Sequence, residues 1–246
     1  MFSIMSFYLE IKASLLKDVV KAIENINAES IWVIDHEGIY IRMSDVYRYK
    51  MLEVKINHRD MVNFKFDSSE PYYLGLVIDR LKDVTKTLKS SDILIMDYDS
   101  NNYFITAESN GLKRNIKLID ISLIGQPPEL VINHDYHSTI ESKKMLSFLK
   151  AISKSISFDV IVSEEKFIIR SETDEGLAEI SWSDKDCNLK NSLGDSTINF
   201  STAEITKALV ACKNDLTIKG SDDSPISFEW DLDLNSTIKS LVAPRV

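Results

Sequence analysis

Near the midpoint of the chain stands the run Ile119-Asp120-Ile121-Ser122-Leu123-Ile124-Gly125-Gln126-Pro127-Pro128-Glu129-Leu130, which we call the central segment. A helix cannot continue past Ile124, because Gly125 lacks a side chain and the Pro127-Pro128 pair lacks two backbone donors and keeps its predecessors extended. The apolar residues of the segment distinguish it from the Gly/Ser-rich composition of flexible linkers. The central segment is therefore predicted to be an extended, partly apolar connection between two halves of the chain.

The two halves share one order of elements. Apolar residues spaced three or four apart predict helices over 10–26 and 77–89 in the first half, and over 141–154 and 201–213 in the second. Alternating runs predict strands at 30–34, 39–43, 50–56, 93–98, 103–108 and 112–119, and again at 158–162, 167–171, 177–182, 216–219 and 226–232. The order of elements is repeated, but the amino-acid sequence itself is not.

Composition places the chain among ordinary globular proteins. Of its 246 residues 44% are hydrophobic, which is ample for a core, and no apolar run reaches the roughly 18 residues that a membrane span needs. The first nine residues lack a basic leader and predict a strand, whereas the last seven form an apolar tail. Cys187 and Cys212 have no metal-like spacing and are expected to be reduced thiols in an intracellular protein.

The distribution of charge matters more than its total. A net charge of −9 argues against binding to nucleic acid, yet the four predicted helices hold 13 of the 29 Lys/Arg and only 7 of the 38 Asp/Glu. Such helices would attract a duplex through its phosphates without reading bases. The alternative is that lysine is simply a good helix former on a solvated face. No aromatic residues interleave these lysines, so stacking platforms for single strands are not indicated.

No pattern in the sequence predicts catalysis. His134 and His137 form a His-x-x-His pair without a third ligand, which is a weak signal for a metal site. The acidic runs Asp92–Asp99 and Asp222–Asp223 are typical of solvated edges and turns. Phosphate-binding, dinucleotide-binding and nucleophile-elbow motifs are missing from the sequence. We therefore predict no catalytic residue, metal or cofactor.

Several short runs, in this order and spacing, resemble one known family. They are Ser30-Ile31-Trp32-Val33, Gly38-Ile39, Met43-Ser44-Asp45, Leu74-Gly75, Leu118-Ile119-Asp120, Leu123-Ile124-Gly125-Gln126-Pro127, Ser224-Pro225-Ile226 and Val242-Ala243-Pro244-Arg245-Val246. Over essentially the whole chain the sequence resembles the DNA polymerase sliding clamps of the proliferating cell nuclear antigen (PCNA) family, especially the archaeal ones.

The resemblance implies an α+β fold of two similar clamp domains, each with two helices packed on antiparallel sheets. The expected domains are residues 1–118 and 131–246, and residues 119–130 are the interdomain connector. Three subunits would close a pseudo-sixfold ring around double-stranded DNA. The residues expected to face the DNA are Lys12, Lys17, Lys21, Arg80, Lys82, Lys86, Lys143, Lys144, Lys150, Lys154 and Lys207.

In this family an apolar pocket beside the connector takes short peptides from partner enzymes. Carried over by position, the pocket residues are Ser44, Arg48, Tyr49, Met51, Leu123, Ile124, Gln126, Pro127, Leu130, Pro225, Ala243 and Pro244. The expected partners are a clamp loader, DNA polymerase, flap endonuclease and DNA ligase, with no membrane partner. Arg48 and Gln126 depart from the family pattern, and Asp18 stands on the first helix in place of a base.

Family rings join through edge strands, which here implies that residues 111–118 of one subunit meet residues 174–182 of another. The hydrophobic interface candidates are Leu112, Ile116, Leu177, Ile180 and Trp182. Because some archaea build the ring from paralogues, both a homotrimer and a heterotrimer are open.

The resemblance thus predicts a non-enzymatic processivity factor for replication and repair. It would act in the cytoplasm of an archaeon, on its nucleoid, or in a eukaryotic nucleus. The alternatives are an enzyme that uses His134 and His137, a peptide-binding module that does not bind DNA, and a clamp-like checkpoint or repair ring.

Overall fold

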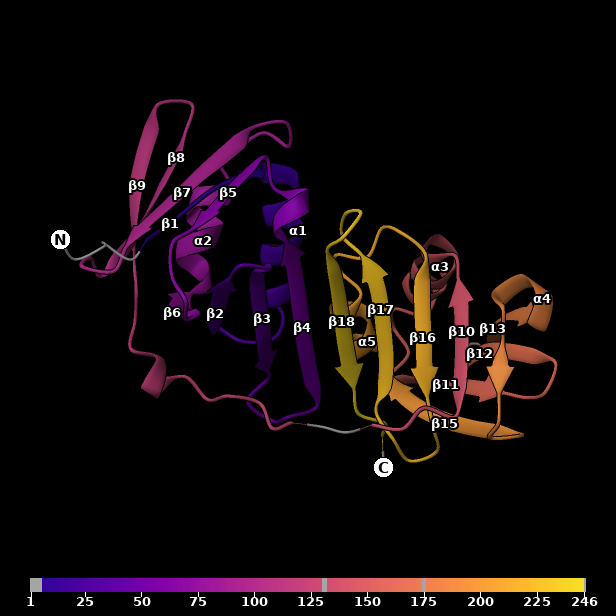
Figure 1. Ribbon diagram of the computed structural model, residues 1–246. Coiled ribbons are helices and arrows are strands. Elements are labelled where there is room, and N and C mark those ends of the chain that lie inside the picture. Colours follow the sequence, from indigo (N-terminus) through magenta and orange to yellow (C-terminus); the bar gives the residue numbers. More distant parts are fainter. Residues whose placement is uncertain (1–5, 130–131, 174–175, 246) are drawn as a thin grey trace. The chain divides into compact units, whose positions relative to one another are not determined.

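The computed structural model describes residues 6–129, 132–173 and 176–245 (Figure 1). The chain divides into two units: residues 1–48, 52–127 and 232–238 form the first, and residues 49–51, 128–231 and 239–246 form the second. The predicted ranges 1–118 and 131–246 did not anticipate these two short exchanged stretches. Across the described residues, the longest helices are too short or too polar to span a membrane.

Nine strands belong to the first unit, of which β4 begins in the stretch that belongs to the second unit. They are β1 (Ser6–Lys12), β2 (Glu29–Asp35), β3 (Gly38–Ser44), β4 (Lys50–Asn57), β5 (Asn63–Phe66), β6 (Tyr72–Val77), β7 (Ile93–Asp99), β8 (Phe104–Ser109) and β9 (Leu112–Lys117). Five of them make an antiparallel sheet in the order β5-β1-β7-β8-β9, and β4, β3, β2 and β6 are hydrogen-bonded neighbours in that order. Two 3₁₀ turns, η1 (His58–Asp60) and η2 (Ile121–Leu123), interrupt the loops.

Alternation of apolar side chains explains these strands. In β1, Phe7, Leu9 and Ile11 are buried while their neighbours are not. Gly38 closes the β2–β3 hairpin with a φ of 129°, a conformation that strongly favours glycine. Trp32 of β2 is 0% exposed and is one of the largest fully buried side chains of the protein.

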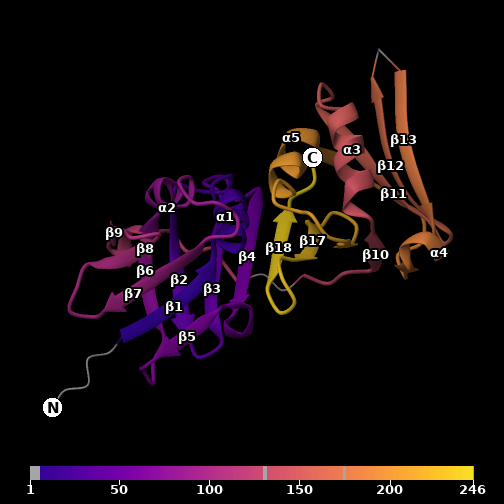
Figure 2. The same cartoon turned by 90° about the horizontal axis from the view of Figure 1, so that it is seen from above.

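The helices of the first unit, α1 (Ala13–Ile23) and α2 (Ile78–Thr85), lie side by side (Figures 1 and 2). Both begin later than predicted, because residues 10–12 complete β1 and Val77 completes β6. Their apolar stripes face the core as predicted: Leu15, Val19 and Ile23 of α1 are buried.

The second unit contains the remaining strands. They are β10 (Tyr136–Ile140), β11 (Ser157–Val162), β12 (Lys166–Thr173), β13 (Gly176–Ser183), β14 (Lys190–Asn191), β15 (Ser196–Ser201), β16 (Leu216–Gly220), β17 (Ile226–Asp231) and β18 (Thr237–Val242), of which the last begins in the stretch that belongs to the first unit. One antiparallel sheet has the order β13-β12-β11-β15, and a second set of neighbours runs β14-β10-β16-β17-β18.

Three helices belong to the second unit: α3 (Ser142–Ala151), the short α4 (Asp184–Cys187) and α5 (Thr202–Ala208). The predicted plan of two helices per half omitted α4. α3 and α5 pack against each other (Figure 2). Ser201 caps α5 by accepting the Glu204 N–H, and the helix ends at Ala208, whereas the sequence predicted a helix up to residue 213.

Candidate functional site

Exposed faces of α1 and α2 carry basic side chains of the first unit. Lys21, Lys82 and Lys86 are exposed, whereas Lys17 and Arg80 are half-buried. Four of the five lie within the helices that the sequence assigned them to, and Lys86 is the C-cap residue of α2. Lys12 lies in neither helix: it is exposed, but it is the last residue of β1 and precedes α1.

Acidic neighbours offset much of this positive charge. The Lys82 ammonium lies 2.8 Å from Glu24 and 3.6 Å from Asp79, and the hydrogen bond to Glu24 raises the pKa of this lysine. Lys86 pairs with Asp83 one turn away. Each of these lysines therefore has part of its positive charge offset by an acidic residue of its own chain.

Backbone carbonyls hold the two half-buried basic residues of the first unit. Lys17 donates to the carbonyl of Leu88, and Arg80 donates to the carbonyl of Lys117 at 2.5 Å. A carbonyl satisfies a donor without cancelling its charge, so both residues remain positive but have less freedom to reach a ligand.

The second unit has the more basic helix. α3 contains three lysines and no acidic residue, and Lys143, Lys144 and Lys150 are exposed together with Lys154 just beyond its end. Among the described residues, the only ion pair of this group is Lys144 with Glu141 at 3.9 Å. The α3 surface is therefore the least neutralised basic surface on the helices.

On α5, Lys207 is exposed and lies 3.1 Å from Glu204. Glu204 also binds Lys50 at 2.5 Å, a lysine that is only 5% exposed. Burial of Glu204 opposes its ionisation, but the hydrogen bonds from Lys50 and Lys207 lower its pKa. Lys207 is thus the most strongly neutralised member of the predicted DNA-facing set in this unit.

The central segment is anchored at its start and exposed beyond it. Ile119 donates its N–H to the carbonyl of Gly75 in β6 at 3.0 Å, and a Cβ on Gly75 would lie 2.4 Å from the Ile119 carbonyl oxygen. The Asp120 carboxylate caps η2 by accepting the Ser122 N–H at 2.9 Å. Residues 121–123 therefore form one 3₁₀ turn, where the sequence predicted extended chain.

Side chains of the central segment offer apolar surface. Leu123 is 77% exposed, Ile124 and Pro127 are half-buried, and Gln126 is exposed. Leu130, which the sequence also assigned to the peptide pocket, lies outside the described residues. The first unit contributes two further members of that predicted set: Ser44 is half-buried, and Arg48 is exposed with a φ of 59°.

In the second unit the predicted pocket residues differ in exposure. Tyr49 is 60% exposed, and its carbonyl accepts the Ala243 N–H at 2.9 Å. Pro225, Ala243 and Pro244 are half-buried. Met51 is 6% exposed, so its side chain belongs to the core and not to an accessible surface, which corrects its assignment.

The predicted apolar tail is only partly a surface. Leu241 and Val242 are 5% and 1% exposed because they complete β18, a strand that the sequence pattern did not predict. After β18, Arg245 donates its N–H to the carbonyl of Asn199 at 2.9 Å. Only the residues from Ala243 onward remain candidates for contact with a partner.

The predicted interface strands β9 and β13 are both edge strands of their sheets. Leu112 and Leu177 are 51% and 61% exposed, and Ile180 is half-buried. Ile116 and Trp182 are 2% and 4% exposed and pack into the cores of their own units. Their assignment as interface side chains is therefore wrong, since the alternation of each strand turns them inward.

Proteins of known function are similar to this chain in sequence. Residues 7–124 match the family model for the N-terminal domain of proliferating cell nuclear antigen. The chain is 26% identical over 250 residues to the DNA polymerase sliding clamp of Thermoplasma volcanium, covering 97% of this chain and 98% of that one. It is 25% identical to the sliding clamp of Pyrococcus furiosus, with 89% of each chain covered. Along nearly its whole length, the chain is therefore similar in sequence to PCNA-type sliding clamps.

Solved structures of PCNA share the fold of this chain. A. fulgidus PCNA, bound to the C-terminal region of FEN-1, superposes with a TM-score of 0.89 over 98% of each chain at 18% identity. PCNA from Entamoeba histolytica gives 0.87 over 98% of this chain and all of that one, at 17% identity. The predicted α+β fold of two clamp domains is confirmed.

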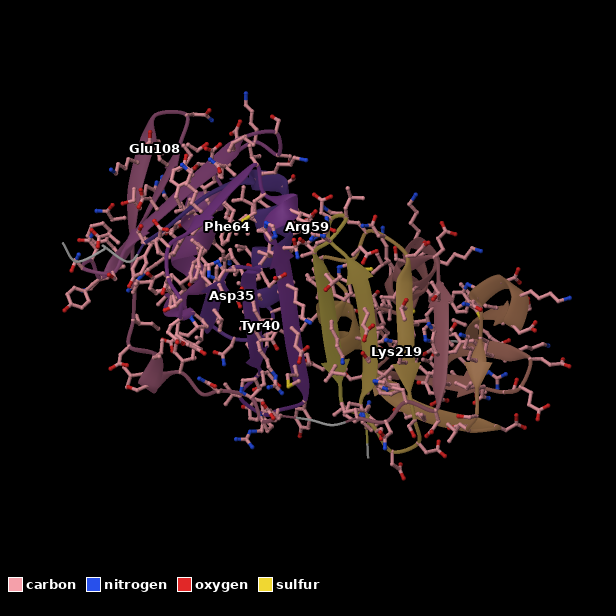
Figure 3. The ribbon with its side chains drawn as sticks, viewed as in Figure 1. Asp35, Tyr40, Arg59, Phe64, Glu108 and Lys219 are labelled. Carbon is pink, nitrogen blue, oxygen red and sulfur yellow. The ribbon has the colours of Figure 1, made fainter. Side chains whose placement is uncertain are left out.

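The two histidines singled out in the sequence are half-buried and lie near lysines. Burial, together with Lys239 and Lys219, lowers the pKa of His134, and burial with Lys219 and Lys190 lowers that of His137. His137 stands opposite Lys219 in the pairing of β10 with β16 (Figure 3 labels Lys219). Within the described residues, no cluster of three His, Cys, Asp or Glu side chains could hold a metal ion.

Sequence reasoning overlooked two exposed side chains next to Arg48. Val46 and Tyr47, in the loop after β3, are 81% and 79% exposed. Two apolar side chains in a row within a turn are unusual for a solvated loop, and this was the available signal. They extend the apolar surface of the first unit beyond the predicted set.

Proposed function

We propose that this protein is a subunit of a sliding clamp that encircles duplex DNA and tethers DNA polymerase and other replication or repair enzymes to it. It acts as a scaffold and performs no catalysis of its own. One observation carries the proposal: in each unit two helices lie side by side and present exposed lysines, in a chain that is similar along its length to DNA polymerase sliding clamps.

The chemistry of these helices suits a contact that slides. Lysine ammonium groups attract the phosphates of a duplex, which carries a charge about every 1.7 Å along its axis. Phosphate contacts carry no direct sequence information, so every register along the DNA is nearly equivalent. Topological closure, and not affinity, would then keep the protein on its DNA.

Partner enzymes would bind through short peptides beside the central segment. Leu123 and Ile124 offer apolar side chains next to backbone that is not part of a sheet, which suits an apolar peptide anchor. A structural relative is bound to the C-terminal region of FEN-1. We include flap endonuclease, DNA polymerase, DNA ligase and a ring-opening clamp loader among the partners of this chain.

Retention on DNA of different topology tests encirclement. The protein is loaded on a nicked circular plasmid with a clamp loader, and bound protein is measured by gel filtration before and after one restriction cut. Encirclement predicts stable retention on the circle and loss from the linear product, because a ring slides off free ends. Equal retention on both forms would contradict encirclement.

Three other functions are separated from this one by experiment. A peptide-binding module without a DNA role would bind partner peptides yet show no topology-dependent retention. If the protein is an enzyme that uses His134 and His137, changing both to alanine would abolish its activity without unfolding it. If it is a clamp, the same change would leave every clamp property intact. A checkpoint or repair ring would be retained on circles but would not stimulate a replicative polymerase.

A clamp acts wherever chromosomal DNA is replicated. We therefore propose that the protein works in the cytoplasm if its source is archaeal and in the nucleus if it is eukaryotic. Fluorescent tagging in the source cell, scored against a DNA stain, tests this location.

A further inference from the structure

Charged side chains of five neighbouring strands form a row across one sheet of the second unit. Lys190 of β14 stands directly opposite His137 of β10, and His137 stands opposite Lys219 of β16. The Lys219 ammonium lies 2.6 Å from the Glu229 carboxylate of β17, and that carboxylate lies 3.9 Å from Lys239 of β18. We call these five residues the charged row.

The charged row lies on the face of its sheet that points away from the core. Tyr136, Ser138 and Ile218 adjoin members of the row along the strands and are 1%, 0% and 1% exposed. Because side chains alternate between the two faces of a strand, the row occupies the opposite face. Figure 3 labels Lys219 of this row. Lys190 is exposed and the other four members are half-buried, so a ligand can reach the row from solvent.

Repulsion within the charged row is only partly offset. Its three lysines are opposed by a single carboxylate, although the chain as a whole has a net charge of −9. Like charges that face each other across strands are destabilising. An anionic ligand on the row would relieve this repulsion, so the row is suited to an acidic partner.

His137 is placed to take up a proton when such a partner binds. Burial lowers the pKa of His137, and the ammonium groups of Lys219 and Lys190 lower it further. Glu229 acts in the opposite direction but does not cancel these effects. A carboxylate bound beside the imidazole would raise its pKa, so binding and proton uptake are coupled.

The spacing of the lysines fits carboxylates on an extended peptide. Neighbouring strands lie about 4.8 Å apart, so Lys190 and Lys219, which are two strands apart, are separated by about 10 Å. Lys239 follows Lys219 after two more strands. An extended peptide rises about 3.3 Å per residue, so acidic residues at every third position recur at the same interval of about 10 Å. The residues between them are neutral, which leaves Glu229 without a negative charge opposite it.

A nucleic acid fits the charged row less well than a peptide does. A duplex carries a phosphate charge about every 1.7 Å along its axis, so some phosphates would meet Glu229. On the same face, the hydroxyls of Thr139 and Thr217 lie 3.4 Å apart beside the row, and such small side chains give bases no surface for stacking. The acidic peptide is therefore the occupant that the geometry favours.

We propose that the charged row binds an acidic, extended segment of a partner protein, with one carboxylate on each of Lys190, Lys219 and Lys239. These lysines belong neither to the proposed DNA-facing set nor to the peptide site beside the central segment. The row is thus a second docking surface, and its use does not depend on encirclement of DNA.

Fluorescence anisotropy with a labelled peptide tests this surface. The probe is a serine–threonine peptide with aspartate at every third position, and the control peptide has the same composition with its aspartates adjacent. We expect the spaced peptide to bind more tightly. Lys190→Gln together with Lys219→Gln should weaken its binding by about two- to fivefold for each lysine. Lys55→Gln together with Lys166→Gln, at two exposed lysines outside the row, should leave the affinity unchanged.

Glu229→Gln is expected to have the opposite effect. It removes the carboxylate of the row and frees Lys219 and Lys239 for the peptide. The affinity should therefore rise, and it should fall more steeply as salt is added. A loss of the fold cannot produce tighter binding, so this variant separates a role in docking from a role in stability.

The affinity should also rise as the pH falls from 8 to 6. The pKa of His137 is higher in the complex than in the free protein, so the complex binds more protons and is favoured at lower pH. His137→Gln should reduce this rise. An affinity that is the same across this range would contradict the part assigned to His137.

Three results would overturn the charged row as a docking surface. They are equal binding of the spaced and the adjacent peptide, unchanged binding by the Lys190→Gln, Lys219→Gln variant, and tighter binding of a DNA duplex than of the spaced peptide through these lysines. Retention on circular DNA should be the same for this variant and for the unaltered chain. Failure of the docking surface is therefore distinguishable from failure of the clamp function.

Discussion

The buried carboxylate of Asp60 shows most clearly how a single residue stabilises this fold. It is 8% exposed and accepts hydrogen bonds from the Asn235 N–H and amide at 2.8 Å each and from the Ser236 hydroxyl at 2.6 Å. Burial opposes ionisation, but these donors outweigh it and hold the pKa of Asp60 below its ordinary value. The carboxylate thereby fixes residues 232–238 within the first unit.

Asp60→Asn is expected to lower the free energy of unfolding by about 1–3 kcal/mol at neutral pH, because it weakens several charge-assisted bonds. A carboxylate with a lowered folded pKa stabilises fully above its unfolded pKa of about 3.9, and this contribution disappears as the pH falls through the lowered value. Urea unfolding between pH 7 and pH 3 should show a smaller acid loss in the variant.

Asp35→Asn is the matched control for Asp60. In the described part of the chain, the Asp35 carboxylate accepts only the Glu37 N–H, in an exposed turn, and an asparagine oxygen also makes this bond. Equal free energies of unfolding for the two variants at pH 7 would contradict a special role for Asp60.

Single residues also explain where the sequence prediction of the elements was wrong. Ile11 fits two periods: it continues the alternation of Phe7 and Leu9, and it also precedes Leu15 by one helical turn. The strand prevails because its neighbours on both sides complete the pairing with β7. Such pairing is a tertiary fact, so the boundary between β1 and α1 could not be predicted from spacing.

Among the elements, β6 holds the start of the central segment by one close backbone approach. Gly75→Ala would drive a Cβ against the Ile119 carbonyl oxygen at 2.4 Å, so the bond from Ile119 to Gly75 should break. We expect faster amide hydrogen exchange at Ile119 and weaker binding of partner peptides. Gly125→Ala is the control, because nothing lies within 4 Å of its new Cβ and its φ needs no glycine. Unchanged exchange in Gly75→Ala would show that the anchor is elsewhere.

The helices differ in the charge that they offer to DNA. Lys143, Lys150 and Lys154 on and after α3 have no ion pair among the described residues, whereas Lys82 and Lys86 are paired with acids. Changing the first three to glutamine should reduce the steepness of the plot of log affinity against log salt concentration. The slope should fall in magnitude by about 0.9 for each phosphate that is no longer neutralised. Changing Lys21, Lys82 and Lys86 to glutamine is the matched control and should flatten it less. The reverse order would contradict this ranking.

Elements whose apolar residues recur at a regular spacing could be predicted from the sequence. Elements that are held only by pairing with a neighbouring strand could not. The apolar stripe of α3, with Met145, Phe148 and Leu149, is buried as predicted. In contrast, β15 carries Thr197 and Asn199 and is held by its ladder to β11. The predicted peptide site was recoverable only through the family resemblance, since its residues share no local pattern.

At the scale of the whole molecule, each unit includes a short stretch from the other half of the sequence. The first unit includes residues 232–238, which bind Asp60 and whose Ser236 hydroxyl oxygen accepts the Asn57 N–H at 3.0 Å. The second includes residues 49–51, which supply buried Lys50 to Glu204. The domain ranges 1–118 and 131–246 therefore cut through both sets of contacts.

Fragments 1–127 and 128–246 should each be less stable than the same unit in the intact chain. The first leaves the buried Asp60 carboxylate without its donors, and the second leaves Glu204 without Lys50, at a cost of about 1–3 kcal/mol for each orphaned group. Urea unfolding monitored by tryptophan fluorescence reports on each, since Trp32 lies in the first fragment and Trp182 and Trp230 in the second. Adding Asp60→Ser to fragment 1–127 is the decisive control. If the missing donors cause the instability, removal of the orphaned carboxylate should restore part of the stability, whereas an unchanged or lower stability would place the cause elsewhere.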